Sequence, residues 1–197
     1  LSDPKFDFHT AAAKVAFNVT ENSPNFKFYR QLAKAITFGI IYGIGNEKLA
    51  AQLSTSEKEA KEYKNNYFSA IKGSRDFIRR VKETAISRGY VRNRYGRRYT
   101  PPEGKEFVLV NYLIQGTSAD LMSECMVRLD EILFEHDSRM LIQVHDELII
   151  EIPIDKTEVV VPIITDIMES NTLKLPVFVD VARCYPSWAH KEDVEKV

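Results

Sequence analysis

Residues 140–152 read MLIQVHDELIIEI, and this stretch decides the fold class. Two apolar runs, Met140–Val144 and Leu148–Ile152, flank the polar segment His145–Glu147. Short apolar runs separated by a few polar residues are typical of an antiparallel hairpin. We therefore expect two buried strands with a polar turn between them.

Helical patterns precede and follow this hairpin. The sequence STSEKE at 54–59 offers a capping box before one helix, and Gly73 separates that helix from the next. Pro162 either kinks the last helix or sets its start. Helices first, followed by helices packed on an antiparallel sheet, predict an α+β fold. We expect helices at 9–19, 26–41, 57–72, 74–88, 107–136 and from 155 onward, and strands at 90–93, 97–100, 140–144, 148–152 and 175–182.

Composition places the chain among globular proteins. Its 197 residues suit one domain or a piece of a larger protein, and 44% hydrophobic with 28% charged residues exclude the disordered and fibrous classes. No apolar run approaches the roughly 18 residues of a membrane span, and no signal peptide precedes the polar start. Cys125 and Cys184 lack a CxxC or His-rich context, which excludes a disulfide framework and a zinc site and fits a reducing compartment. Because the chain begins with Leu1 rather than Met, we expect it to be part of a longer product.

The net charge of −1 conceals a strong asymmetry. Residues 1–105 carry 20 Lys and Arg against 10 Asp and Glu, whereas residues 106–197 carry 7 against 18. The densest basic stretch, Lys72–Lys105, holds 11 cations and 3 acids. This division suits a cationic face for a polyanion and an anionic face elsewhere, for instance for a metal ion; solvated helix surfaces are the alternative.

The helix expected at 26–41 carries two stripes on opposite sides, each repeating every fourth residue. Steps of four drift only about 40° around the helix and span about 18 Å over the four members of a stripe. Two cations one turn apart can meet the phosphates of a bound nucleotide, and two aromatic rings can meet its base and sugar. The alternative is a surface helix whose rings pack on a neighbour. The apolar stripe is Phe28, Leu32, Ile36 and Ile40, and the cationic-aromatic ridge is Arg30, Lys34, Phe38 and Tyr42.

Two adjacent carboxylates, Asp146 and Glu147, form an acidic tip on the expected hairpin. Adjacent carboxylates repel each other, and a hard cation such as Mg²⁺ removes that penalty. A polar surface turn is the alternative, but this turn lacks the Gly or Asn that a tight two-residue hairpin prefers.

Two further groups of polar residues suit contacts with nucleic acid. Arg94, Arg97 and Arg98 lie among tyrosines in the smaller hairpin, a combination that suits phosphate contacts and base stacking. Asn111 and Gln115 share one face of the helix expected at 107–136 and can bond base edges or the sugar-phosphate backbone. Solvent-facing amides are the alternative for this pair.

Together these motifs resemble the A-family DNA polymerases, over nearly the whole chain. The resemblance implies a helical fingers subdomain, within 1–105, followed by part of an antiparallel-sheet palm, within 106–197. The segments similar to family motifs are RxxxKxxxFGxxYG at 30–43, VHDE at 144–147, GYV at 89–91, GRR at 96–98, NxxxQGTxAD at 111–120 and DxHxxA at 7–12.

The resemblance implies a nucleotide site on the ridge. Arg30, Lys34 and His9 would bind the triphosphate of an incoming deoxynucleotide, and Lys34 would protonate the pyrophosphate leaving group. Phe38 would sit against the sugar, where Phe implies discrimination against dideoxynucleotides. Tyr42 would pack near the template base.

The resemblance also implies metal and DNA contacts. Asp146 would be one of two aspartates that bridge two Mg²⁺ ions, and Glu147 would be an accessory metal carboxylate. His145 would contact the primer end, and Asn111 and Gln115 would touch the primer-template near its minor groove.

One departure is decisive: the family's other catalytic aspartate lies upstream of the 7–12 segment, outside this chain. Phe107 also stands where the family often carries Arg. We therefore expect the carboxyl-terminal portion of a DNA-directed DNA polymerase, in the cytoplasm, on the nucleoid or in a host cytoplasm, inactive without its amino-terminal portion. Its partners would be primer-template DNA and deoxynucleoside triphosphates. The alternatives are a non-catalytic nucleotide or nucleic-acid binding module and a metal-dependent phosphohydrolase that uses the acidic tip.

Overall fold

The computed structural model describes residues 6–170, 173 and 176–194. The chain forms two compact units, and their boundary lies within the long helix α6 (Val108–Glu135), between Thr117 and Ser118. Helices combined with three antiparallel strand pairs confirm the α+β class. The fingers and palm ranges of 1–105 and 106–197 stay a prediction. No helix in the described ranges is long and apolar enough to cross a membrane.

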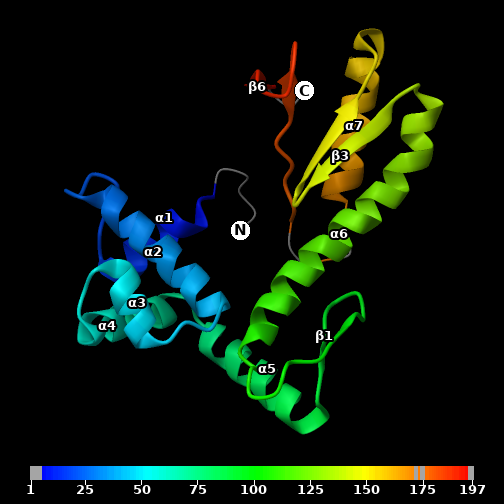
Figure 1. The fold of residues 1–197 in the computed structure, drawn as a ribbon. Helices are drawn as coiled ribbons and strands as arrows, with labels where there is room; N and C mark the ends of the chain where they lie inside the picture. Colours follow the sequence, from blue (N-terminus) through cyan, green and yellow to red (C-terminus); the bar gives the residue numbers. More distant parts are fainter. Residues whose placement is uncertain (1–5, 171–172, 174–175, 195–197) are drawn as a thin grey trace. The chain divides into compact units, whose positions relative to one another are not determined.

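Four helices of the amino-terminal unit enclose its main core (Figure 1). Ile36 and Leu49 are fully buried there, and the small residues Ala13, Ala33 and Ala60 allow the helices to approach closely. The core therefore fixes which side of the second helix faces solvent. The four helices are α1 (Phe8–Phe17), α2 (Phe26–Ile41), α3 (Asn46–Leu53) and α4 (Glu57–Ala70).

The prediction that Phe28 belongs to the apolar stripe of α2 is wrong. Phe28 is 56% exposed, whereas the other three members are buried. Tyr29 packs toward the core instead, with its ring 5.5 Å from that of Phe17. The reason is the 3.6-residue period, which alternates steps of three and four, so that Tyr29 and Leu32 share a face.

The helix ends follow local sequence signals, with one exception. Ser56 and Glu59 form the expected capping box at the start of α4. Gly89, with φ of +74°, ends α5 (Ser74–Arg88) in the left-handed region that favours glycine. The sequence pattern does not predict α3, because Gly43 and Gly45 suggest an irregular segment. In the structure Gly45 is extended and serves as the N-cap of α3.

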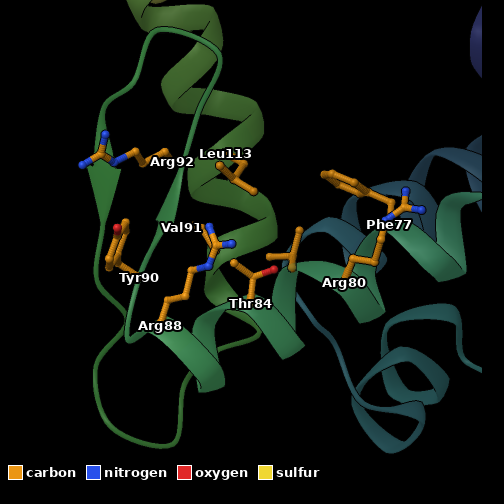
Figure 2. Close-up of a pocket in the computed structure, with 9 residues that line it drawn as sticks. Phe77, Arg80, Thr84, Arg88, Tyr90, Val91, Arg92 and Leu113 are labelled. Carbon is orange, nitrogen blue, oxygen red and sulfur yellow. The ribbon is translucent and has the colours of Figure 1, made fainter.

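A small hairpin follows α5, and its Val91 packs in one cluster with Val81 of α5 and Leu113 of α6 (Figure 2). Asn93 organises its turn, because its Oδ1 accepts backbone hydrogen bonds at 3.1 and 2.9 Å. Tyr99 lies directly on Gly116 of α6, where an added Cβ would be 1.8 Å from the tyrosine hydroxyl. Gly116 is therefore required for this close approach. The strands are β1 (Val91–Arg92) and β2 (Arg98–Tyr99), shorter than predicted.

The carboxyl-terminal unit packs one strand pair and a helix on the second half of α6. Its buried residues include Leu129, Leu133 and Val160. The prediction that both strands are buried is wrong. The first strand is mostly exposed, with Leu141 and Ile142 at 52% and 49%, and the second is half-buried. The elements are β3 (Arg139–Val144), β4 (Glu147–Glu151), the 3₁₀ turn η1 (Ile154–Lys156), α7 (Thr157–Glu169), β5 (Ala182–Cys184) and β6 (Lys191–Asp193).

Two further expectations in this unit need correction. Pro162 lies inside α7 and does not mark its start. The strand expected at 175–182 falls partly outside the described residues, and 176–181 are not in a strand. Instead, β5 begins at Ala182 and pairs with β6, with Cys184 opposite Lys191.

Candidate functional site

The cationic-aromatic ridge lies on the side of α2 opposite its buried stripe. Phe38 and Tyr42 are 44% and 52% exposed, although both are large aromatic residues. Lys34 is also exposed, and its Nζ lies 5.9 Å from the centre of the Phe38 ring. The structure thus places two cations and two rings on one accessible face, as the four-residue spacing predicts.

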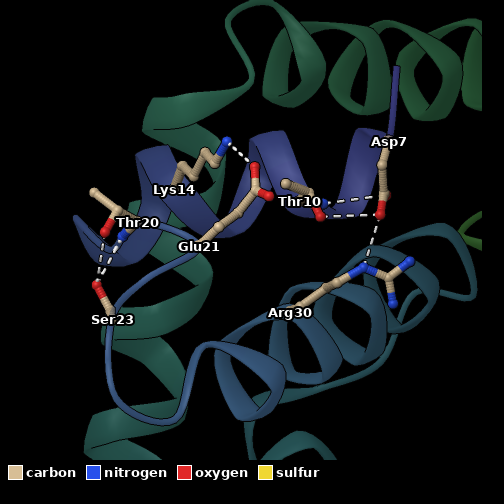
Figure 3. Close-up of polar contacts among 7 residues, drawn as sticks. All are labelled: Asp7, Thr10, Lys14, Thr20, Glu21, Ser23 and Arg30. Atoms are coloured by element: carbon tan, nitrogen blue, oxygen red, sulfur yellow. Dashed lines mark hydrogen bonds and ion pairs between the residues drawn. The ribbon is translucent and has the colours of Figure 1, made fainter. Parts of the chain in front are cut away.

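Arg30 is held in place by Asp7, a residue to which the sequence pattern assigns no role. The Arg30 Nε donates to Asp7 Oδ2 at 2.7 Å, and the two terminal nitrogens of Arg30 point away from Asp7 (Figure 3). Asp7 also caps α1, because it accepts hydrogen bonds from the backbone of His9 and Thr10. An aspartate directly before a helix is the signal that could have found this cap.

The charge of Asp7 is stabilised by these contacts. Burial alone would raise the pKa of Asp7, but hydrogen bonds from Arg30 and Thr10 and the charge of Arg30 outweigh burial and lower that pKa to about 2. Asp7 is therefore ionised at neutral pH and orients Arg30 without consuming its terminal donors.

His9, on α1, lies beside the ridge of α2. Its ring lies 6.0 Å from that of Phe38, and its Nδ1 is buried without a hydrogen-bond partner among the described residues. Burial lowers the pKa of His9, Asp7 opposes the shift, and the cations of Arg30 and Lys34 lower it further. The lowered pKa favours a neutral His9 ring, which can donate one hydrogen bond and accept another.

The end of the ridge is fastened to the start of α6. Gln115 Nε2 donates to the Tyr42 hydroxyl at 3.0 Å. Gly43, with φ of +71°, lies against Phe107, where an added Cβ would be 2.6 Å from a ring carbon. Gln115 thus contacts the ridge at Tyr42, and its predicted contact with the primer-template stays a prediction. Asn111, on the same helix, has a buried Oδ1 that lacks a partner within the part of the chain that the structure describes.

The arginines of the small hairpin differ in their surroundings. Arg98 stacks on Tyr90, with its guanidinium carbon 3.9 Å from the ring centre. Arg94 is exposed near the turn, and Arg97 contributes its backbone amide to Asn93. Their predicted DNA contacts stay predictions, but all three side chains lie at an exposed surface.

The acidic tip lies in the carboxyl-terminal unit, at a two-residue turn. His145 has φ of +54°, a left-handed conformation that is uncommon outside glycine, and its carbonyl accepts a hydrogen bond from Gln143. The Asp146 side chain is exposed, whereas Glu147 is half-buried and its Oε1 lies 3.2 Å from Lys191 Nζ. The expected turn is therefore present, and it presents Asp146 to solvent.

Carboxylate oxygens are the ligand type that Mg²⁺ prefers. The carboxylates of Asp146 and Glu147 are therefore of the right ligand type for a magnesium ion, but Glu147 also pairs with Lys191. Among the described residues no group of three potential metal ligands gathers anywhere. The chain thus offers part of a metal site. The resemblance implies that Lys34 and Asp146 serve one reaction. Because the two residues belong to different units, this stays a prediction.

Comparison with known proteins identifies the family. The chain matches the profile of DNA polymerase family A over residues 2–190. It is 37% identical over 202 residues to DNA polymerase I of Rhizobium leguminosarum. This match covers 92% of this chain and 20% of that protein. With the thermostable DNA polymerase I of Thermus thermophilus the identity is 37% over 186 residues, covering 89% and 22%. The chain spans about a fifth of the length of these curated relatives.

A solved structure shows the same relationship in three dimensions. The chain is similar to the POL domain of Pol1 from M. smegmatis, in complex with DNA primer-template and dNTP, with a TM-score of 0.79 and 32% sequence identity. The match covers 86% of this chain and 32% of that one. Because profile, sequence and structure agree over most of its length, the chain belongs to DNA polymerase family A.

Proposed function

We propose that this chain takes part in template-directed addition of deoxynucleotides to the 3′ end of a DNA primer. The observation that carries the proposal is the exposed ridge, with Arg30 oriented by Asp7 and His9 lying beside Phe38. The relative from M. smegmatis was solved with primer-template and dNTP, which supports the same ligands for this chain.

The ridge would bind the incoming nucleotide along its length. The terminal nitrogens of Arg30 and the ammonium of Lys34 supply the positive charge for the triphosphate. His9 adds one neutral hydrogen bond to the same phosphates. Phe38 supports the sugar, and Tyr42, fastened by Gln115, lies near the template base.

The reaction would replace a phosphoanhydride bond at the α-phosphorus by a phosphodiester bond. The primer 3′ oxygen forms a bond to this phosphorus and loses its proton to water. The bond to the bridging oxygen breaks, and pyrophosphate leaves. Lys34 gives a proton to this leaving group and regains one from solvent.

Asp146 and Glu147 would hold Mg²⁺, which neutralises charge on the reacting phosphate oxygens when bound. We propose that the second bridging aspartate comes from polypeptide outside this chain, since two adjacent carboxylates do not complete a two-ion site. His145, Asn111 and the hairpin residues Arg94, Arg97 and Arg98 would contact primer-template DNA.

Primer extension tests the proposal. We expect no extension by the 197-residue chain alone and extension once the amino-terminal portion of the polymerase is added. Robust extension by the chain alone would overturn the need for a second aspartate. An assembly that binds DNA without any Mg²⁺-dependent incorporation would identify a non-catalytic binding module instead.

A further inference from the structure

A groove of about 570 Å³ lies apart from the ridge, in the same amino-terminal unit (Figure 2). Its walls come from α5, from the small hairpin and from α6, and no residue of α2 lines it. Pockets of 300–1,000 Å³ are the usual size for small ligands or for one unit of a polymer. The lining residues are Phe77, Arg80, Val81, Thr84, Arg88, Tyr90, Val91, Arg92 and Leu113.

Three arginines of this groove keep their charge available. Among the described residues, no carboxylate pairs with Arg80, Arg88 or Arg92. Arg79 offers a direct contrast, because it lies next in sequence, does not line the groove, and pairs with Asp76 at 3.4 Å and Glu83 at 3.1 Å. Four cations of α5 lack a carboxylate partner among the described residues. Arg80 and Arg88 line the groove, whereas Arg75 and Lys82 do not.

The groove also offers a platform for a flat apolar group. Phe77 is 38% exposed and makes no ring-ring or cation-ring contact with the described residues. Tyr90, in contrast, carries Arg98 on its ring at 3.9 Å and has Arg92 at 5.6 Å from its ring centre. Buried Val81 and Val91 form an apolar floor between Phe77 and the hairpin. A free ring that lines the same groove as three arginines suits a nucleic acid strand, in which bases alternate with phosphates.

We propose that this groove binds a single-stranded segment of nucleic acid, with phosphates on Arg80, Arg88 and Arg92 and a base stacked on Phe77. The proposal rests on the proposed function, since copying a template requires an unpaired template strand. A duplex would not serve as well, because its bases are stacked on one another and cannot reach the Phe77 ring. The groove is a second nucleic-acid contact, separate from the nucleotide ridge.

Binding of a fluorescein-labelled twelve-nucleotide oligo(dT) to the 197-residue chain, followed by anisotropy at several salt concentrations, tests the proposal. The triple variant Arg80→Ala/Arg88→Ala/Arg92→Ala should bind at least tenfold more weakly. The slope of log K against log salt should fall by about 2, since each phosphate contact on a single strand contributes roughly 0.7. Phe77→Ala should weaken binding about fivefold or more without changing the slope.

Two controls separate a specific groove from general attraction by charge. Lys48→Ala/Lys58→Ala/Lys61→Ala removes the same charge from exposed positions on α3 and α4, and Arg79→Ala removes the neutralised arginine. Both should change the affinity less than twofold. All substituted side chains are exposed, and circular dichroism checks that the variants fold. A loss with the lysine variant equal to that of the groove variant would overturn the proposal, as would displacement of oligo(dT) by equimolar thymidine monophosphate.

The outcome is independent of whether the ridge works as proposed. Arg30→Ala/Lys34→Ala should keep the oligo(dT) affinity and lose nucleotide incorporation in the assembled polymerase. If the assembly incorporates no nucleotide while the groove variant still loses single-strand binding, the proposed function fails and the groove assignment stands. Unchanged oligo(dT) binding by the groove variant would overturn the groove assignment and leave the proposed function unaffected.

Discussion

The cationic-aromatic ridge and the acidic tip differ in how firmly the chain holds them. On the ridge, Arg30 is bonded to Asp7, and Tyr42 is bonded to Gln115. At the tip, Asp146 is exposed and makes no hydrogen bond or ion pair with the described residues. The proposed nucleotide ridge is therefore held by contacts within this chain. At the acidic tip, Glu147 pairs with Lys191, but Asp146 has no such contact among the described residues.

This difference predicts that substitutions near the ridge affect stability and chemistry together, whereas substitutions at the tip affect chemistry alone. A preorganised group loses little freedom on binding, which favours affinity. An exposed, unpaired carboxylate contributes little to folding.

The largest expected effect is on the reaction itself. In the assembled polymerase, Lys34→Ala should lower the rate of single-nucleotide incorporation by roughly 10²–10⁴-fold, the range of general acid catalysis. Lys34→Arg keeps the charge but is a far weaker acid, so it should preserve triphosphate affinity and still lose most of the rate. Rapid-quench kinetics measure the triphosphate affinity and the incorporation rate separately. A Lys34→Arg enzyme with the parental rate would show that Lys34 acts only through its charge.

The next effect concerns the attachment of the ridge. Gly43→Ala should lower the free energy of unfolding by roughly 2–4 kcal/mol, since it combines a left-handed backbone with a clash against Phe107. Gly45→Ala is the matched control, because Gly45 has φ of −71° and no atom within 4 Å of an added Cβ. Urea unfolding measures both. Equal losses of unfolding free energy in the two variants would show that the Phe107 contact is not the cause.

A smaller, pH-dependent effect tests the contact between Asp7 and Arg30. Both side chains are 37% exposed, so Asp7→Asn should cost about 0.2–1 kcal/mol at pH 7. The folded pKa of Asp7 lies near 2, below its usual 3.8, so this stability is present above pH 4 and is lost as the pH falls toward 2.

Asparagine also caps helices well, so Asp7→Asn isolates the ion pair, whereas Asp7→Ala should lose about 1 kcal/mol more through the cap. Denaturant titrations between pH 2 and pH 7 provide the curves. A difference between parent and Asp7→Asn that persists unchanged at pH 2 contradicts the assignment.

The smallest effect on stability is expected at the tip. Asp146→Asn should leave the free energy of unfolding within about 0.5 kcal/mol of the parent, because the side chain is exposed and unpaired among the described residues. It should nevertheless abolish incorporation in the assembled polymerase. A clearly destabilised Asp146→Asn variant would erase the contrast between ridge and tip.

Local patterns in the sequence are sufficient for the ridge, the capping box and both predicted hairpins, because each depends on neighbours within a few residues. They are insufficient where partners are distant. Asp7 meets Arg30 across 23 residues, and Glu147 meets Lys191 across 44. They also mislead where one residue has two uses: Gly45 reads as a breaker, yet it caps α3. Phe28 shows that a strict four-residue stripe departs from the true helical period.

A double-mutant cycle of nucleotide incorporation tests most directly whether ridge and tip serve one reaction. Lys34→Ala, Asp146→Ala and the double variant would be compared with the parent in the assembled polymerase, under single-turnover conditions with Mg²⁺. If both residues act on the same transition state, the double variant loses far less than the product of the two single losses. An Asp146→Ala enzyme as fast as the parent, or losses that simply multiply, would contradict a common site.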